Sequence, residues 1–324
     1  MDDLNSNASP LPPDEDLTEV RKPASLLVAQ FFLFPLIIIG ISVAIFLFFG
    51  YLIFGSVDQK TPAQYLERMR GGTGTQRWQA AYELSNLVKA NPERAHTPEF
   101  VEKVTQTYKD TADEEILARG FMARMLGEFK EVSAVPLLAD GLRRSEKLKT
   151  KEWESGGLLG FLRPSVSQIR EELIQEQIYT LSALQSIGDN SAVPIVLEFG
   201  RNQEASVRKN AAFVLGKLGD PRAVEGLRAL LADTAEDVRW YAALALAELK
   251  NGDGSEVLMK LLDRSYVNAI PDMKADDKAV LMANAVTALG MLRHEPAKEQ
   301  IRALSKNDEA PAVQYAAMEA LKKY

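Results

Sequence analysis

The residue types that bind metals or act as nucleophiles are scarce in this 324-residue sequence. There is no cysteine, which excludes disulfides, zinc–thiolate sites, iron–sulfur clusters and cysteine nucleophiles. The two histidines are His96 and His294, and only His294 is followed directly by an acid, Glu295, in the sequence RHEP. One imidazole and one carboxylate cannot hold a di-iron centre. We therefore expect no metal site, and we expect both histidines to be turn residues.

A second chemical candidate is the glycine-rich stretch GGTGTQR at residues 71–77. A phosphate-binding loop of this kind needs a lysine and a preceding strand, and both are missing here. We interpret the stretch as a flexible link into the first long helix. The sequence thus predicts no catalytic residue and no cofactor-binding residue.

Two tryptophans stand beside arginines in closely similar sequences, RWQAAYELSNL from Arg77 and RWYAALALAEL from Arg239. Tryptophan and arginine are enriched among the residues that dominate protein–protein binding energy. Trp78 and Trp240 are therefore candidate partner contacts on the inner face of a repeat array. The alternative is that both rings pack against the next hairpin.

The duplication belongs to a longer series of similar segments. Val207-Arg208 recurs 31 residues later as Val238-Arg239, and equivalent leucines occur at positions 84, 126, 184, 215, 246, 289 and 321. We call these seven the repeat leucines. Their spacings of 42, 58, 31, 31, 43 and 32 residues indicate a period near 31 with insertions. Such a period is typical of a solenoid built from two short helices per unit.

The periodicity within the units predicts helices with one apolar face. In VRWYAALALAEL, Val238, Ala242, Leu246 and their neighbours recur at helical spacing. Gly219-Asp220-Pro221 suits a turn, since glycine tolerates a left-handed exit, aspartate caps and proline fits a first helical turn. Seven hairpins are expected. Their first helices centre near Leu66, Val104, Leu138, Leu197, Leu227, Leu258 and Ile301, and their second helices near Ala81, Met122, Leu181, Phe213, Ala243, Val286 and Met318.

This pattern resembles the HEAT-repeat family, in particular the short repeats of phycobilisome lyases. The resemblance covers about residues 61–324 and is closest over Gln203–Asp263. It implies an all-α solenoid in which arginines and acids, here Arg208 and Arg239 with Glu204 and Asp237, bridge adjacent repeats. The repeat is a packing unit found in many proteins that are not enzymes, so the resemblance does not establish lyase activity.

The N-terminal region has a different composition. Residues 1–22 carry six acids against two basic residues and are interpreted as a disordered acidic tail. Residues 23–57 contain no charge in 35 positions, which predicts a transmembrane anchor with a helix from about Leu26 to Phe54. Gly40 and Ala44 are a candidate small-residue contact for another transmembrane helix. A link with a first short helix follows at 58–74, and the solenoid occupies 75–324.

Two insertions interrupt the repeats, at 143–173 and 264–277. The first part of the 143–173 insertion carries five basic residues, and an apolar cluster in a glycine-rich setting follows, Leu158, Leu159, Phe161 and Leu162. This cluster is the main candidate partner contact, with self-packing and lipid contact as alternatives. The second insertion has an apolar side and contains Pro271, which forbids a continuous helix.

These features together predict a non-catalytic, membrane-anchored protein-binding scaffold or assembly factor. The expected partners are a membrane protein or membrane-associated complex and the bilayer itself, with the repeats on the cytoplasmic side of the cell membrane. The formal charge of −7, from 38 basic and 45 acidic residues, opposes nucleic-acid binding. The alternative is a lyase-like or other enzyme that holds a small-molecule cofactor in the solenoid groove.

Overall fold

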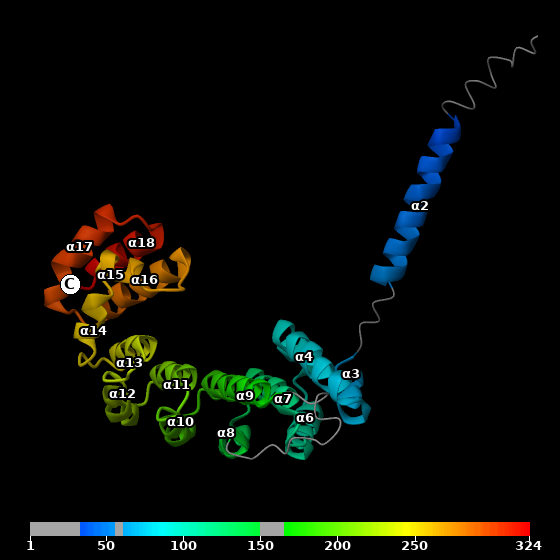
Figure 1. The fold of residues 1–324 in the computed structure, drawn as a ribbon, viewed down its shortest axis with the longest axis horizontal. Helices are drawn as coiled ribbons and strands as arrows, with labels where there is room; N and C mark the ends of the chain where they lie inside the picture. The colour runs from blue at the N-terminus through cyan, green and yellow to red at the C-terminus, as the bar shows by residue number, and fades with distance from the viewer. Residues whose placement is uncertain (1–32, 56–60, 150–164) are drawn as a thin grey trace, which may run out of the picture. The chain divides into compact units, whose positions relative to one another are not determined.

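The computed structural model describes residues 33–55, 61–149 and 165–324, and its helices are shown in Figure 1. These residues fall into two compact units, 1–59 and 60–324. The described parts of both units are helical, without a strand. The all-α class predicted from the sequence is therefore confirmed for the described residues.

The first unit contains the helix α2 (Phe34–Gly55), whose apolar side chains between Leu36 and Phe49 are exposed. The predicted contact of Gly40 and Ala44 with another transmembrane helix stays a prediction. None of the described helices combines the length and the hydropathy that crossing a membrane requires. The predicted localisation, a single-pass cell-membrane protein with cytoplasmic repeats, is thereby corrected. The part of the predicted span from Leu26 to residue 32 lies outside the described residues.

The second unit contains seven helical hairpins within 61–149 and 165–324. The pairs are α3 (Pro62–Gly71) with α4 (Gly74–Ala90), α6 (Pro98–Asp110) with α7 (Ile116–Glu128), α8 (Val135–Lys149) with α9 (Val166–Ile187), α10 (Val193–Phe199) with α11 (Ala205–Leu218), α12 (Val224–Leu230) with α13 (Glu236–Glu248), α14 (Ser255–Lys260) with α16 (Ala275–Met291), and α17 (Lys298–Asn307) with α18 (Pro311–Leu321). Every predicted helix centre lies inside its helix. Short helices α5 (Pro92–Ala95) and α15 (Arg264–Asn268) occupy connections.

The two predicted insertions differ from expectation in extent. Arg143–Lys149 continues α8 and residues 166–173 begin α9, so the first interruption is shorter than 143–173. The helical spacing of Leu142, Ser145 and Leu148, all buried, extends the apolar stripe of α8 past Arg143. The second insertion contains α15 and leads through Pro271 and Asp272 into α16.

The turns follow the predicted chemistry. Gly219 ends α11 with φ 72°, a left-handed conformation that glycine adopts without a steric cost. The Asp220 carboxylate accepts a hydrogen bond from the Arg222 backbone N–H at 2.8 Å, and Pro221 opens the following 3-10 turn. Gly188 and Asp189 repeat this arrangement after α9.

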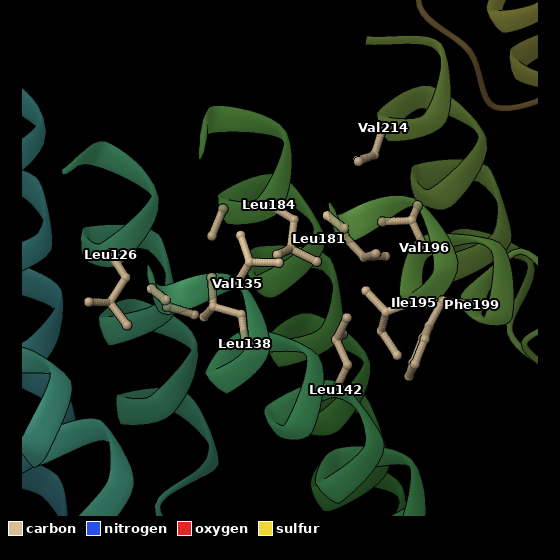
Figure 2. Packing of buried hydrophobic residues seen from close by; sticks show 14 of the residues in the cluster. Leu126, Val135, Leu138, Leu142, Leu181, Leu184, Ile195, Val196, Phe199 and Val214 are labelled. Atoms are coloured by element: carbon tan, nitrogen blue, oxygen red, sulfur yellow. The ribbon is translucent and has the colours of Figure 1, made fainter. Parts of the chain in front are cut away.

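The repeat leucines occupy equivalent positions in the core of successive hairpins. Six of the seven are fully buried, and Leu321 in the last hairpin is partly buried. Figure 2 shows Leu126 and Leu184 from successive second helices, with α8 residues Val135, Leu138 and Leu142 beneath them. Each leucine thus fills the space between its own hairpin and the next, which an isolated hairpin would leave exposed.

Glycine beside the repeat leucine brings alternate second helices into close contact. A Cβ on Gly127 would lie 2.6 Å from Ala183 Cα, and one on Gly216 would lie 2.8 Å from Ala245 Cα. A Cβ on Gly290 would likewise lie 2.6 Å from Ala320 Cβ. In each case the glycine follows a repeat leucine and the alanine precedes the next one. We call these three pairs, which join α7 to α9, α11 to α13 and α16 to α18, the glycine–alanine contacts.

An arginine near the start of many second helices joins adjacent hairpins. Arg208 donates to the Asn202 and Gln203 carbonyls at 2.9 and 2.8 Å and to both Asp233 carboxylate oxygens at 2.7 and 2.8 Å. Arg239 donates in turn to the Asp233 carbonyl at 2.7 Å. The predicted bridging between repeats is therefore present. The acids expected beside these arginines bind other cations, since Glu204 accepts from Arg170 at 2.9 Å.

The same ladder position holds the most deeply buried ion pair of the described residues. Arg119 donates from Nε and Nη2 to the two Glu176 carboxylate oxygens at 2.8 and 2.7 Å, and both side chains are about 1% exposed. Arg119 also donates to the Ala112 carbonyl at 3.1 Å. Burial raises the pKa of the Glu176 carboxyl, and the hydrogen bonds and charge of Arg119 oppose that rise. Neither group can lose its partner without leaving a desolvated polar group.

We predict that Gly216→Ala destabilises the repeats. The added methyl would overlap the backbone of Ala245, which cannot move aside as a flexible side chain would. Overpacking of this kind costs about 1–3 kcal/mol and exceeds the ~1 kcal/mol that alanine contributes to an exposed helix. Urea unfolding followed by circular dichroism measures the change. The swap Gly216→Ala/Ala245→Gly should recover most of the loss, and Gly74→Ala, with open space around it, should cost nothing.

We predict that Glu176→Gln lowers the free energy of unfolding by about 3–5 kcal/mol, because it removes the buried, doubly hydrogen-bonded counter-charge of Arg119 and leaves only the partly exposed Asp113 carboxylate at 3.9 Å. The double variant Arg119→Met/Glu176→Leu removes both charges and should be markedly more stable than Glu176→Gln. Equal stability of the single and double variants would contradict this account.

Candidate functional site

The main predicted contact, the apolar cluster Leu158, Leu159, Phe161 and Leu162, lies outside the described residues. Its role as a partner contact stays a prediction. Gly40 and Ala44 are described, and both are exposed on α2. The remaining candidates, Trp78 and Trp240, lie in the repeats and can be compared directly.

The two tryptophans occupy equivalent repeat positions but different environments. Trp78 on α4 is 37% exposed, whereas Trp240 on α13 is 4% exposed. The second insertion covers Trp240, whose Nε1–H donates to the Tyr266 hydroxyl at 3.4 Å. That hydroxyl donates to Glu236 at 3.2 Å, and burial raises the pKa of Tyr266. Trp240, on the fifth hairpin, therefore packs against the sixth hairpin, while Trp78 remains accessible.

Aromatic rings continue from α4 onto the next two second helices, where Phe121 is buried and Tyr179 is partly exposed. Tyr82, one helical turn after Trp78 and 46% exposed, makes an edge contact with Phe121 at 5.3 Å between ring centroids. Phe121 contacts Tyr179 at 5.5 Å, and the Arg124 guanidinium lies 5.2 Å from the Tyr179 centroid. We call Trp78, Tyr82, Phe121, Arg124 and Tyr179 the aromatic row. Among the described residues, no carboxylate forms an ion pair with Arg124.

A second aromatic pair lies farther along the same layer of second helices. Phe213 on α11 and Tyr241 on α13 are 6.1 Å apart. The Lys217 ammonium lies 5.4 Å from the Phe213 centroid and pairs with Glu248 at 2.6 Å. Lys209 lies 5.9 Å from the Tyr241 centroid and pairs with Asp237 at 3.1 Å.

Two cavities open beside this pair, and together we call them the groove. One of about 540 Å³ lies between Phe213, Lys217 and Glu248 on one side and Thr287 and Met291 on the other. Another of about 420 Å³ extends towards the second insertion. Both are lined by Tyr241, Leu244 and Asn284, so they adjoin along α13 and α16.

The residues of the aromatic row and of the groove suit non-covalent binding of a ligand. Apolar walls with a few polar groups bury a ligand and orient it. In the described part of the chain, no group of three or more His, Asp or Glu side chains is arranged to hold a metal ion. His96 is an exposed turn residue stacked on Phe129 at 5.5 Å, and His294 begins a 3-10 turn. The glycine-rich stretch at 71–77, expected as a flexible link, is mostly helical: α3 ends at Gly71, and α4 begins at Gly74 after the cap Thr73.

Sequence analysis missed most of the aromatic row and the groove, although the repeat register carries a signal for them. Phe121, Tyr179 and Tyr241 each stand five residues before a repeat leucine, and Asn284 takes the same place in the sixth hairpin. One position of the repeat therefore faces this surface in several units. Trp78 and Trp240 lie six residues before a repeat leucine, where the exposure of the ring depends on whether another segment packs over it.

Comparisons with known proteins identify the repeat type. The family model for HEAT repeats matches residues 166–247 and 194–270. These residues carry HEAT repeats, as the resemblance predicted. No curated protein matches the chain.

Solved structures with similar arrangements include the complex of CpcE and CpcF of phycocyanin lyase from Nostoc sp. PCC7120, at 19% identity and TM-score 0.49, covering 82% of this chain and 88% of that one. A designed armadillo repeat protein matches at 14% identity and TM-score 0.39, over 82% and 99% of the two chains. Human deoxyhypusine hydroxylase matches at 14% and 0.29, over 81% and 95%. At these identities and scores the likenesses add nothing about activity.

We predict that the two tryptophans differ in access to solvent quenchers. In a Trp153→Phe background, iodide should quench Trp78 emission several-fold more strongly than Trp240 emission, because only Trp78 has an exposed ring. Trp78→Phe should therefore remove most of the quenchable fluorescence, and Trp240→Phe should remove little. Equal quenching constants for the two single-tryptophan proteins would contradict the described burial.

Proposed function

We propose that this protein is a non-catalytic binding scaffold that holds a protein partner against its layer of second helices. The observation that carries the proposal is the aromatic row with its arginine. Tyr82 and Trp78 supply exposed ring surface, and the Arg124 guanidinium lies 5.2 Å from the Tyr179 ring centroid and forms no ion pair with a carboxylate of the described residues. The HEAT repeats of residues 166–270 support a scaffold role in general.

The energetics favour a macromolecular contact over solvent exposure for this row. Aromatic side chains bring large contact areas with little rotational entropy to lose, so they contribute much of the energy of protein interfaces. Arg124 is already oriented by its ring contact, which lowers the cost of ordering it for a partner carboxylate. A partner with an exposed acid flanked by apolar side chains fits this surface.

The alternative function, an enzyme holding a small-molecule cofactor, has one observation in its favour. The larger cavity of the groove, about 540 Å³, falls in the size range of small-molecule sites. Native mass spectrometry of the purified full chain tests it. A non-covalent adduct of defined mass or a visible absorbance band would favour a cofactor protein over a scaffold.

The scaffold proposal is tested with a photoreactive benzoylphenylalanine at Tyr82 in the full chain, irradiated in cells. We expect a discrete adduct with another protein. Val132, which is 51% exposed on a turn before α8, is the matched control site and should give no such adduct. Adding Arg124→Ala should reduce the Tyr82 adduct by about tenfold, since loss of an anchoring arginine typically costs more than 1 kcal/mol of binding.

Equal adducts from Tyr82 and Val132 would contradict a specific surface. Adducts only within the chain would contradict partner binding at the aromatic row. An adduct at Tyr82 that Arg124→Ala leaves unchanged would contradict the assigned role of the arginine.

A further inference from the structure

The groove lies at one of the steps of the repeat stack that lack a glycine–alanine contact. At the step from α13 to α16, the position that holds glycine elsewhere is Ala247, and it is followed in the next unit by Ala288. Both are buried. Each carries a Cβ, whereas the glycine at the α11–α13 step has none and so lets those two helices approach closely. The second insertion lies at this same step, and its Pro271, Asp272 and Met273 line the smaller cavity. The open step is therefore part of the architecture of this unit.

The groove runs along the axes of three helices. Its insertion end is lined by Asp237 and Asp277, near the first turns of α13 and α16. Its other end is lined by Glu248 and Met291, the last residues of the same helices. From Asp277 to Met291 the helix rises roughly 21 Å, which an extended chain of about six residues spans.

The charges that line the groove are unequal at its two ends. Lys217 is paired with Glu248, and Lys209 with Asp237, so these four groups cancel across the α11–α13 wall. Among the lining residues, Lys250 then remains at one end, and Asp272 and Asp277 remain at the other; none of these three forms an ion pair with a described residue. The nearby Lys278 is directed to the Asn268 carbonyl at 2.7 Å and does not line the groove.

Apolar and amide groups occupy the middle. Tyr241, Leu244 and Ala288 form apolar wall, and Asn284 is exposed with no hydrogen-bond partner for its side-chain amide among the described residues. A peptide backbone offers both a donor and an acceptor that such an amide can bind. The groove thus presents a negative end, an apolar centre with one amide, and a positive end.

We propose that the groove binds an extended peptide segment of about six residues, with a basic side chain at the Asp272–Asp277 end, apolar side chains at the centre and an acidic side chain at the Lys250 end. This inference rests on the proposed function and specifies one partner segment of the scaffold. Charge complementarity selects the segment, because a peptide with two ends of one sign meets repulsion at one end. The apolar centre of the groove supplies contact area, and the charges at its two ends fix the direction in which the peptide binds.

The test uses fluorescein-labelled, end-blocked octapeptides that share a Leu-Ser-Leu-Ser centre. The dipolar peptide has two lysines at one end and two glutamates at the other, and its reversed sequence covers the second chain direction. All-lysine and all-glutamate ends provide the controls. Fluorescence anisotropy with the full chain at low salt should show one dipolar peptide binding at least about fivefold more tightly than either control, since each exposed charge pair contributes about 0.2–1 kcal/mol.

Charge reversal at neighbouring positions supplies matched variants. Asp277→Lys should abolish the advantage of the dipolar peptide over the all-glutamate peptide. Asp276→Lys adds the same charge one residue away, outside the groove lining, and should leave the advantage in place. Lys250→Glu should abolish the advantage over the all-lysine peptide. Circular dichroism melts establish that each variant is folded.

Several outcomes would overturn the inference. Equal binding of all peptides, or equal effects of Asp276→Lys and Asp277→Lys, would show that the lining charges do not select the segment. The scaffold proposal fails separately, because it depends on the adduct at Tyr82 on a different part of the surface. A Tyr82 adduct without peptide selectivity would retain the scaffold and reject this groove, and selectivity without a Tyr82 adduct would do the reverse.

Discussion

The structure depends on how closely adjacent second helices can approach. Three glycine–alanine contacts, Gly127 with Ala183, Gly216 with Ala245 and Gly290 with Ala320, bring backbones together at distances that no side chain at the glycine would permit. The close approach lets small residues form the seam while the repeat leucines fill the adjoining space. Because these contacts alternate along the chain, the repeats are joined by tight and looser steps in turn.

The surroundings of the aromatic row and the groove depend on the alternating close and looser steps between second helices and on the arginines that join adjacent hairpins. The arginine ladder fixes one edge of several steps through turn carbonyls and carboxylates, as Arg208 does with Asp233. The hydrogen bond from Arg208 lowers the pKa of the Asp233 carboxyl, so this stabilisation is present above the unfolded-state pKa and is lost as the pH falls through the folded-state value. The aromatic row and the groove are formed by other residues of the same second helices, which carry rings and charges that packing does not require.

Much of the fold could be predicted from sequence, because leucine spacing and turn chemistry are local signals. The seven hairpin centres and the turn at Gly219-Asp220-Pro221 required only periodicity and backbone preferences. The different fates of Trp78 and Trp240 could not be predicted, because Tyr266, which covers Trp240, belongs to an insertion with no repeat counterpart. The apolar run at 23–57 was also interpreted wrongly. Its hydropathy alone predicted a membrane span, and the described helix α2 does not provide one.

The division of the core at α13 has a consequence for how the repeats respond to stress. Val238, Ala242 and Leu246 belong to the core shared with the preceding hairpins, whereas Trp240, Ala243 and Ala247 on the same helix belong to the core of the following ones. In a linear array each unit is stabilised mainly by its neighbours, so the weakest coupling sets the boundary of a cooperative block. A segment seated across that boundary touches both blocks at once. A segment bound in the groove would contact residues of both cores, and we expect it to couple their unfolding.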